Sequence, residues 1–316
     1  MVEIKNFDNW IEDIEFGKFG SGASEKVWLI NPDTNEKGLF KFPKVKDKER
    51  GIITGEYWAE KLATEIGRLI DVECANVDIG TYKGRIGSMS YNIIDEHTSL
   101  TEGVEFILGV YPYYNRDLLV DEFSGKKYSL QMILECIKLQ LPFLITANDI
   151  LKILIFDALI GNSDRHHSNW GIISTKSSLI ITNGELTAQK IAMSPLYDNG
   201  SSLCSYISED EIEEIFKDNM RYNAIINTKS KSAIGWNDIR PIRHFDLIEN
   251  IQKEYYEETR DFVNKIKNNI NEETINNILI NFDNDIISEK MKKLLKKFII
   301  DRKDKIINIY NLDSEV

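Results

Sequence analysis

The sequence predicts an α+β fold with two unequal lobes: a β-rich amino-terminal lobe that contains one helix, and a larger, mainly helical carboxy-terminal lobe. Short alternating segments separated by turn residues fill most of the first hundred positions, whereas helical spacing of apolar residues prevails beyond them. No glycine follows Gly235 and no proline follows Pro241, a pattern typical of long uninterrupted helices. We expect the lobes to divide into residues 1–98 and 99–316, with a hinge at the division and a cleft between the lobes.

The amino-terminal lobe is expected to begin with a β-hairpin. The segments KVWLIN and GLFKFP alternate apolar with polar residues, and the turn cluster PDTNEKG joins them. The next segment, residues 54–70, has the spacing of an amphipathic helix, with one apolar stripe along it. Two further strands, NVDIGTY and RIGSMSYNII, complete the predicted lobe.

Two helices should open the carboxy-terminal lobe, over residues 128–141 and 148–161. The second helix is apolar almost all round, so we expect it at the centre of the core. Asn148 or Asp149 is its predicted N-cap, and Gly161 is its predicted stop, because glycine adopts the left-handed conformation that often ends a helix.

Short strands and further helices are predicted after Gly161. WGIIS, SLIIT and LTAQKIAM are expected strands, the last two joined by a hairpin turn at Asn183-Gly184. Ser208 and Glu211 have capping-box spacing, and the remainder has helical character. The lysine-rich segment 288–300 has the composition of a helix that binds a membrane surface or a partner. We interpret it as an ordinary helix with solvated lysines, because its apolar residues supply a stripe for the core.

Composition narrows the classes of function. The 316 residues carry a formal net charge of −12, which disfavours a nucleic-acid binder, because such proteins need a basic surface to neutralise phosphates. The three cysteines are far apart and form no CxxC pair, so we expect a reducing compartment. The amino terminus lacks the apolar stretch of a signal peptide, and no long apolar run follows. We expect a cytoplasmic protein that binds neither nucleic acid nor membrane; export without a signal peptide stays open.

The stretch NSDRHHSNWG, residues 162–171, concentrates residue types that phosphoryl transfer requires. Asp164 and Asn169 lie in one loop between a buried helix and a strand, and Asp198 follows in SPLYDNGSS. In such a reaction an acidic group orients the attacking hydroxyl, and oxygen ligands hold Mg²⁺ against the phosphates. Two aspartates and an asparagine can supply these groups, because Mg²⁺ prefers hard oxygen donors.

A cation from the amino-terminal lobe should hold the phosphates, and Lys41 in LFKFP is the candidate. A lysine on an apolar strand is unusual unless it has a partner, although alternation would also permit a solvent-facing position. Glu56, at the start of the predicted helix, is the expected partner of Lys41. Glu60, one turn later on the same face, is the alternative.

A glycine-rich segment, FGKFGSGASEK, precedes the first strand of the predicted hairpin. Glycines let backbone N–H groups approach phosphate oxygens closely, but this spacing matches neither GxGxxG nor a Walker motif, and alone it is compatible with a plain turn. The order of the parts favours a phosphate loop. The parts occur in the same order as in protein kinases: a glycine loop, a strand lysine, a helix glutamate, an Asp-x4-Asn motif and a second aspartate.

These motifs are similar to those of the HipA-like serine/threonine kinases, bacterial toxin-type kinases with a protein-kinase-like fold. The resemblance covers residues 15–205 and is most specific in LIGNSDRHHSNW and PLYDNGSS. It implies transfer of the γ-phosphate of ATP, with Mg²⁺, to Ser or Thr hydroxyls of a protein. It also implies autophosphorylation at a loop serine; Phe19 aligns best with that serine, and Ser21 and Ser24 are nearby.

Carried over residue by residue, the resemblance assigns roles to these positions. Asp164 would be the catalytic base, in a loop supported by His166, and Asn169 and Asp198 would be the metal ligands. Lys41 would bind the ATP phosphates. The other ATP-binding positions would be Gly20, Ser21, Gly22, Ala23 and Ser24 in the phosphate loop, Glu56 on the helix, and Asn92 and Ile94, whose backbone would meet adenine at the hinge.

Two features limit what the resemblance carries over. The longer HipA toxins have an additional amino-terminal subdomain, whereas here the glycine loop lies close to the start, so we expect a compact form. An antitoxin partner and an operator-DNA complex are therefore not supported by the sequence. Asp198 is followed by Asn-Gly, as in this family but unlike the Phe-Gly of eukaryotic protein kinases.

Three other functions stay open at this point. The DRHxxN pattern also occurs in phosphoinositide kinases, so a lipid or small-molecule acceptor is the nearest alternative. A nucleotide-binding regulatory module without catalysis is the second. A metal hydrolase built on Asp164, His166, His167 and Asp198 is the third, although hydrolytic zinc sites usually draw their ligands from separated elements.

Overall fold

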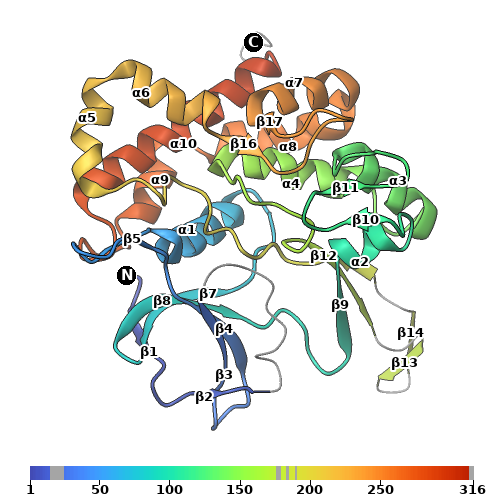
Figure 1. Ribbon diagram of the computed structural model, residues 1–316, viewed down its shortest axis with the longest axis horizontal. Coiled ribbons are helices and arrows are strands. Elements are labelled where there is room, and N and C mark those ends of the chain that lie inside the picture. The colour runs from blue at the N-terminus through green and yellow to red at the C-terminus, as the bar shows by residue number, and fades with distance from the viewer. Residues whose placement is uncertain (15–24, 176–178, 183–184, 189–190, 313–316) are drawn as a thin grey trace.

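The computed structural model describes residues 1–14, 25–175, 179–182, 185–188 and 191–312. It has two unequal lobes, with the strands of the smaller lobe below the helices of the larger one in the view of Figure 1. The predicted α+β fold is confirmed. The residue at which one lobe gives way to the other stays a prediction.

A six-stranded sheet forms the amino-terminal lobe, in the order β1-β7-β8-β4-β3-β2. Its strands are β1 (Lys5–Asn6), β2 (Ile11–Glu12), β3 (Lys26–Ile30), β4 (Lys37–Lys41), β7 (Val77–Tyr82) and β8 (Arg85–Tyr91). β3 and β4 pair as the predicted antiparallel hairpin, and β1 pairs parallel with β7, which the sequence analysis does not predict. The predicted helix, α1 (Glu56–Leu69), packs against β7 and β8, and it follows a small hairpin of β5 (Val45–Asp47) and β6 (Ile52–Ile53).

The alternation of side chains along β4 decides where Lys41 lies. Phe40 is fully buried in a small core with Phe7, Leu29 and Met89. Leu39 and Lys41 have the opposite orientation and line a cavity between the lobes. Because successive residues of a strand point to opposite faces, the burial of Phe40 places Lys41 in the cleft.

A second sheet has three antiparallel strands in the order β15-β12-β9. These strands are β9 (Thr98–Glu102), β12 (Gly171–Thr175) and β15 (Ile191–Met193). β13 (Leu179–Thr182) and β14 (Glu185–Ala188) pair as the predicted hairpin, whose turn residues Asn183 and Gly184 lie outside the described residues. The segment LTAQKIAM, expected to be one strand, divides into β14 and β15, because the two pair with different partners.

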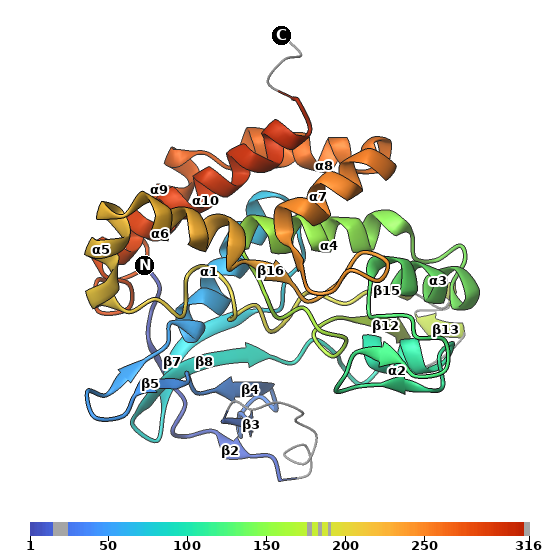
Figure 2. The same ribbon diagram turned by 45° about the horizontal axis from the view of Figure 1, so that its top comes forward.

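Helices make up most of the larger lobe (Figure 2). They are α2 (Gly103–Leu108), α3 (Leu130–Gln140), α4 (Ala147–Ile160), α5 (Ile212–Lys217), α6 (Asn219–Asn223), α7 (His244–Glu254), α8 (Tyr256–Asn269), α9 (Glu272–Leu279) and α10 (Glu289–Ile309). Shorter elements are a 3₁₀ turn (Glu209–Glu211), a π turn (Ala224–Thr228) and the two hairpins β10–β11 (Tyr114–Asn115, Val120–Asp121) and β16–β17 (Lys231–Ser232, Ile242–Arg243). α4 contacts α7, α8 and α10, and its buried residues confirm it as the central helix.

The ends of α4 agree only in part with the prediction. Thr146 is the N-cap, and its backbone N–H donates to the Asp149 carboxylate at 2.9 Å. The prediction of Asn148 or Asp149 as N-cap is therefore wrong, because the helix begins earlier and both residues lie in its first turn. Gly161 does end the helix, with a left-handed φ of 69°.

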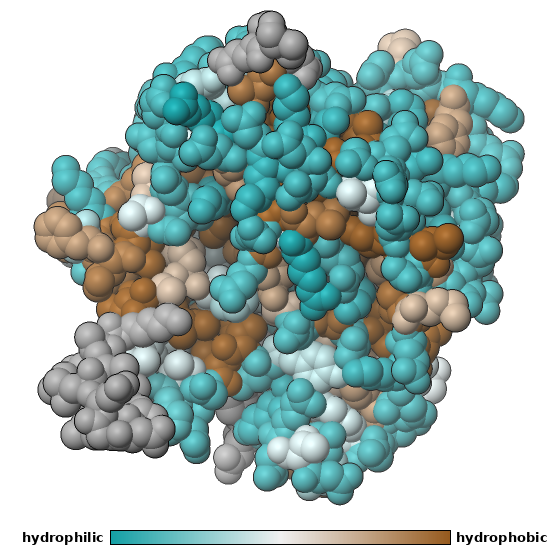
Figure 3. All heavy atoms as spheres, turned by 180° about the vertical axis from the view of Figure 1, so that it is seen from behind, coloured by the Kyte–Doolittle hydropathy of each residue, from teal (hydrophilic) through white to brown (hydrophobic). Residues whose placement is uncertain are grey.

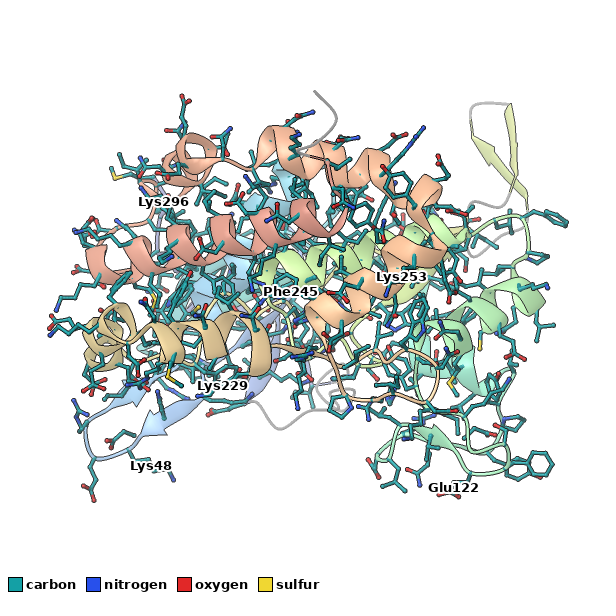
Figure 4. The ribbon with its side chains drawn as sticks, turned by 90° about the horizontal axis from the view of Figure 1, so that it is seen from above. Lys48, Glu122, Lys229, Phe245, Lys253 and Lys296 are labelled. Atoms are coloured by element: carbon teal, nitrogen blue, oxygen red, sulfur yellow. The ribbon has the colours of Figure 1, made fainter. Side chains whose placement is uncertain are left out.

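Helix α10 is part of the core, as its apolar spacing predicts. Its buried side chains include Met291, Leu294, Leu295 and Ile299. Phe245 of α7, labelled in Figure 4, lies against α10, with its ring centroid 4.8 Å from the Arg302 guanidinium carbon. On the face seen in Figure 3, hydrophilic side chains cover most of the helical lobe. Among the described residues, no helix combines the length and the apolar character that a membrane crossing requires.

Candidate active site

A cavity of about 340 Å³ lies between the lobes and has apolar walls suited to an aromatic base. Trp28 and Leu39 line it from the amino-terminal sheet, and Ile94 and Leu100 line it from the segment that follows β8. Asn92 also lines it, but its backbone N–H donates to the Lys37 carbonyl oxygen at 2.9 Å. That N–H group therefore completes the sheet, and the Asn92 side chain donates to the Ile94 carbonyl oxygen at 2.9 Å.

Lys41 contacts two carboxylates in this cleft. Its Nζ lies 3.0 Å from Asp198 Oδ1 and 3.6 Å from Glu60 Oε2, and its side chain is only 15% exposed. Burial by itself would lower the pKa of the Lys41 ammonium, but the two carboxylates raise that pKa above its usual value. Burial likewise works to raise the pKa of Asp198, and Lys41 lowers it below the usual aspartate range. Both groups are therefore charged at neutral pH, and a solvent-facing Lys41 is excluded.

The sequence predicts Glu56 as the partner of Lys41, and this prediction is wrong because the partner is Glu60. Glu56 bonds instead to Lys44 Nζ at 3.0 Å and accepts a hydrogen bond from the Tyr206 hydroxyl at 2.8 Å. The two glutamates are one helical turn apart on the same face of α1, so their spacing in the sequence does not decide which of them pairs with Lys41. The packing of α1 against the sheet decides between them, because it buries Glu60 to 2% exposure next to Lys41.

Glu60 also holds the loop that contains Asp198. Its carboxylate oxygens accept hydrogen bonds from the backbone N–H groups of Asn199 and Gly200, at 2.9 and 3.1 Å. A Cβ atom at position 200 would lie 3.1 Å from the Glu56 carbonyl oxygen, so the close approach of this loop to α1 favours glycine. Asp198 has a left-handed φ of 58°, which aspartate tolerates better than most residues. Helix α1 therefore sets the position of Asp198.

Arg165 joins the loop of residues 162–169 to α4 and to the Asp198 loop. It is fully buried, and its guanidinium forms a bidentate pair with Asp157, through Nε–Oδ2 at 3.0 Å and Nη2–Oδ1 at 2.8 Å. It also donates to the backbone carbonyl oxygens of Asn169 and Tyr197, both at 2.8 Å. A buried charge needs this degree of pairing. One side chain thus keeps the two loops at a fixed separation.

Asp164 and Asn169 line the cleft from this same loop. The Asn169 side-chain amide donates to the Asp164 carbonyl oxygen at 2.7 Å, which leaves its amide oxygen for the cavity that it lines with Asp198. Asp164 lines an adjoining cavity of about 190 Å³ together with Lys41 and Asp198. Burial in the cleft raises the pKa of Asp164 above its usual value; His166 opposes this shift and Asp198 adds to it.

The hydrolase alternative does not fit these contacts. His167 is buried, and its Nδ1 lies 3.0 Å from the Tyr114 hydroxyl, so that nitrogen serves the core. Within the described residues, no three His, Cys, Asp or Glu side chains are gathered where they could hold a metal ion. Asp198 and the Asn169 amide provide oxygen atoms, which suit Mg²⁺ better than zinc.

Sequence comparison connects this site to a known kinase, although no protein-family model matches the chain. Serine/threonine-protein kinase CtkA of Helicobacter pylori (strain J99) is 25% identical in an alignment of 299 positions, which covers 92% of this chain and 83% of that protein. The crystal structure of a proinflammatory kinase CtkA of Helicobacter pylori is similar over 99% of both chains, with a TM-score of 0.77 and 22% identity.

A second structural relative is HipA of Shewanella oneidensis MR-1, in a complex with HipB and operator DNA. It has a TM-score of 0.56 and 14% identity, over 92% of this chain and 66% of HipA. The sequence relative is a serine/threonine kinase, and both structures have the fold described above. The chain is similar to the HipA-like kinases in its fold. Its activity is that of a protein kinase, and it uses ATP for phosphoryl transfer.

The expected phosphate loop of this kinase falls in the part of the chain that the structure does not describe. Gly20, Ser21, Gly22, Ala23 and Ser24 lie outside the described residues, as does Phe19. Their assignment to ATP therefore stays a prediction. The described part begins again immediately before β3, whose Lys26 and Trp28 line the nucleotide cavity.

Several residues of the kinase cleft are absent from the predicted set. Leu39 precedes Lys41 by two positions on β4, and Lys26 is directly opposite Lys41 on β3. Alternation along β4 could have found Leu39, because positions two apart share a face, and the register of the predicted hairpin could have found Lys26. Lys44 and Tyr206, which hold Glu56, had no such signal, because 162 residues separate them.

The histidines of the catalytic loop have structural contacts. His166 Nδ1 accepts a hydrogen bond from the Ser168 backbone N–H at 3.2 Å, so this ring supports the turn beyond Asp164. Burial lowers the pKa of His167 to about 4 and that of His244 to about 3. His244 Nε2 lies 2.8 Å from the Asn162 carbonyl oxygen, so it braces the start of the same loop. Both buried rings are neutral at pH 7.

We expect acid to destabilise this kinase through His167 and His244. A histidine whose folded pKa is depressed stabilises the fold fully above its unfolded pKa of about 6.5, and this stability is lost as pH falls toward the folded value. Between pH 7.0 and 5.5 the free energy of unfolding should fall by about 1 kcal/mol for each of the two. Urea unfolding at both pH values measures this. In His244→Gln, the decrease in the free energy of unfolding between the two pH values should be about half that of the wild type. In the control His97→Gln, at an exposed position, the decrease should equal that of the wild type. An equal decrease in all three proteins would contradict the role given to His244.

Glu60→Gln is expected to lower kcat/KM for ATP about 100-fold, because displacement of a catalytic group by about 1 Å has costs of that size. The glutamine side chain has no charge to face Lys41. Its single amide oxygen replaces only one of the two carboxylate oxygens that accept hydrogen bonds from the Asp198 loop. Glu56→Gln, on the same helix, is the matched control and should change kcat/KM about threefold at most. Steady-state kinetics with varied ATP measures both variants. A larger loss for Glu56→Gln would restore Glu56 as the important glutamate.

Proposed function

We propose that this protein transfers the γ-phosphate of ATP to serine or threonine hydroxyls of a protein, with Asp164 as the catalytic base. The observation that supports this most is the convergence of Lys41, Asp164 and Asp198 on one cavity, next to the larger cavity with apolar walls. A base, a fixed cation and an oxygen donor beside a nucleotide-sized cavity are the parts that phosphoryl transfer needs.

Each side chain has a defined task in this proposal. Trp28 and Ile94 hold the adenine base, and the Lys41 ammonium neutralises the phosphates. The Asp164 carboxylate accepts the proton of the attacking hydroxyl, and its raised pKa makes it a better base than an ordinary aspartate. Glu60 and Arg165 keep these groups in place without contact with ATP.

The Asn169 amide oxygen and the Asp198 carboxylate are the described groups that would hold Mg²⁺. Both are hard oxygen donors that line the nucleotide cavity, and the lowered pKa of Asp198 keeps its carboxylate ionised. When bound, the metal neutralises charge on the phosphate oxygens. We also expect autophosphorylation of a serine in the glycine-rich segment, with Ser21 and Ser24 as candidates.

Incubation with γ-labelled ATP and a mixture of protein, lipid and metabolite acceptors tests the proposal. We expect label in protein bands, on serine or threonine after acid hydrolysis. Label only in an extracted lipid or metabolite fraction would replace the protein acceptor by a small one. Tight ATP binding without transfer to any acceptor would favour a regulatory nucleotide-binding module instead.

A further inference from the structure

A separate cavity of about 660 Å³ opens beside the catalytic loop. Ser163, Asp164 and His166 of that loop line it, and so do Arg116, from the β10–β11 hairpin, and Lys231 of β16. An acceptor hydroxyl must come within hydrogen-bond distance of the Asp164 carboxylate, and this cavity offers room beside that carboxylate for the residues around the acceptor. We refer to the cavity as the cationic groove, after the three cations Arg116, Lys231 and Arg240 that line it.

These three cations lack a carboxylate partner among the described residues, and this sets Arg116 and Arg240 apart from the other surface arginines. In the described part of the chain, no Asp or Glu oxygen lies within 4.0 Å of their nitrogens; Arg240 Nε donates to the Ala233 carbonyl oxygen at 2.8 Å. The other arginines with exposed side chains all pair with carboxylates. They are Arg50, Arg68, Arg85, Arg221, Arg243 and Arg260.

The charge of the whole chain makes this cluster informative. With a net charge of −12, unpaired cations would not be expected to gather beside the catalytic base unless they face an anion. Glu102 and Glu105 line the groove too, but they also line the nucleotide cavity and so belong to the end nearest ATP. The further acidic residues of the groove are the catalytic-loop residue Asp164 and Asp117, which is beside Arg116 in the chain.

The β10–β11 hairpin, which contributes Arg116 to the groove, exposes side chains typical of a protein-binding surface. Tyr113 and Phe123 flank the β10–β11 hairpin, 65% and 84% exposed, and their rings stack with centroids 5.7 Å apart. Leu118, in the turn of this hairpin, is exposed as well. Exposed aromatic side chains next to arginine are enriched in protein–protein contacts. Figure 4 shows Glu122 of the same hairpin at an outer edge of the molecule, where a large partner can reach it.

We propose that the cationic groove binds acidic residues that flank the acceptor serine or threonine of a protein substrate, and that Arg116 and Lys231 determine this specificity. The inference rests on the proposed function and adds a substrate class to it: acidic peptide segments. Arg116 and Arg240 also lie near enough to His167 to help burial lower its pKa, which agrees with their convergence above the loop. Arg240 is half-buried and bonded to backbone, so the two exposed cations supply the adjustable part of the site.

Matched peptides with one central serine test this specificity. They carry acidic, neutral or basic flanking residues, and kcat/KM is measured for the wild type and for Arg116→Ala, Lys231→Ala and the double variant. Exposed Lys253→Ala on α7 is the control. We expect the acidic peptide to be preferred by the wild type, and each groove substitution to lower kcat/KM for that peptide about fivefold. The neutral peptide should be unaffected, and added salt should weaken the preference.

The outcomes separate the two proposals. Loss of the acidic preference in the groove variants, with transfer to the neutral peptide retained, supports the groove. Three outcomes would overturn the proposed role of the groove and leave the protein-kinase function intact. They are equal use of all peptides, a preference for basic or phosphorylated flanking residues, and a loss in the groove variants equal to that in Lys253→Ala. If the wild type transfers phosphate to no peptide or protein, the proposed function fails, and the substrate class fails with it.

Discussion

Asp164→Asn is expected to lower kcat for phosphoryl transfer about 10²–10⁴-fold, the usual contribution of a positioned general base. Asparagine has the size of aspartate but cannot accept the proton of the attacking hydroxyl. The loop should keep its conformation, because the bonds that hold position 164 use its backbone: its N–H donates to Asn162 Oδ1 and its carbonyl oxygen accepts from Asn169. The variant should therefore bind an ATP analogue as the wild type does.

Label transfer from ATP measures the loss, and circular dichroism with a binding titration checks the fold and the nucleotide site. Asp246→Asn on α7 is the matched control, because it removes an exposed aspartate that lines neither the nucleotide cavity nor the groove. Its activity should not fall.

Asp198→Asn should lose transfer as Asp164→Asn does, but it should also weaken nucleotide binding in the presence of Mg²⁺, because it removes an oxygen donor and a partner of Lys41. Activity of Asp164→Asn within about tenfold of the wild type would exclude Asp164 as the base.

The largest effect on stability is expected for Asp157→Asn. This substitution leaves the Arg165 guanidinium fully buried without its carboxylate, and broken buried pairs of this kind cost about 3–5 kcal/mol. Arg165 also holds Asn169 and the Asp198 loop, so the catalytic residues should lose their alignment at temperatures where the variant is still folded. Urea unfolding gives the free energy, and kinetics below the unfolding transition gives the second effect.

An exposed arginine–aspartate pair supplies the comparison. Arg243 and Asp246 are 51% and 40% exposed at their side chains, and surface pairs contribute only about 0–1 kcal/mol. Asp246→Asn should therefore leave the free energy of unfolding nearly unchanged. Equal stabilities for the two variants would mean that Arg165 finds other partners and that the loop does not depend on this pair.

Much of the architecture could be predicted from local patterns. The β3–β4 hairpin follows from alternation and a turn cluster, and α4 follows from an apolar segment closed by Gly161. Predictions of the residue at which a helix or strand begins were less accurate. The N-cap of α4 is Thr146, because several polar residues near a helix start compete for that role and packing selects one. Strand β1 is two residues long, too short for any pattern to identify.

The sequence by itself determined the kind of chemistry: Asp164, Asn169 and Asp198 lie close enough to distinctive neighbours to be recognised as parts of a kinase. Their types and local spacing are properties of short segments, and short segments can be read directly. Only the tertiary structure decided that Lys41 pairs with Glu60, because Glu56 has an equivalent place in the sequence and the choice depends on how α1 packs against the sheet. The cationic groove likewise exists only after folding, since Arg116 and Lys231 are distant in the chain and meet beside Asp164 through long-range packing.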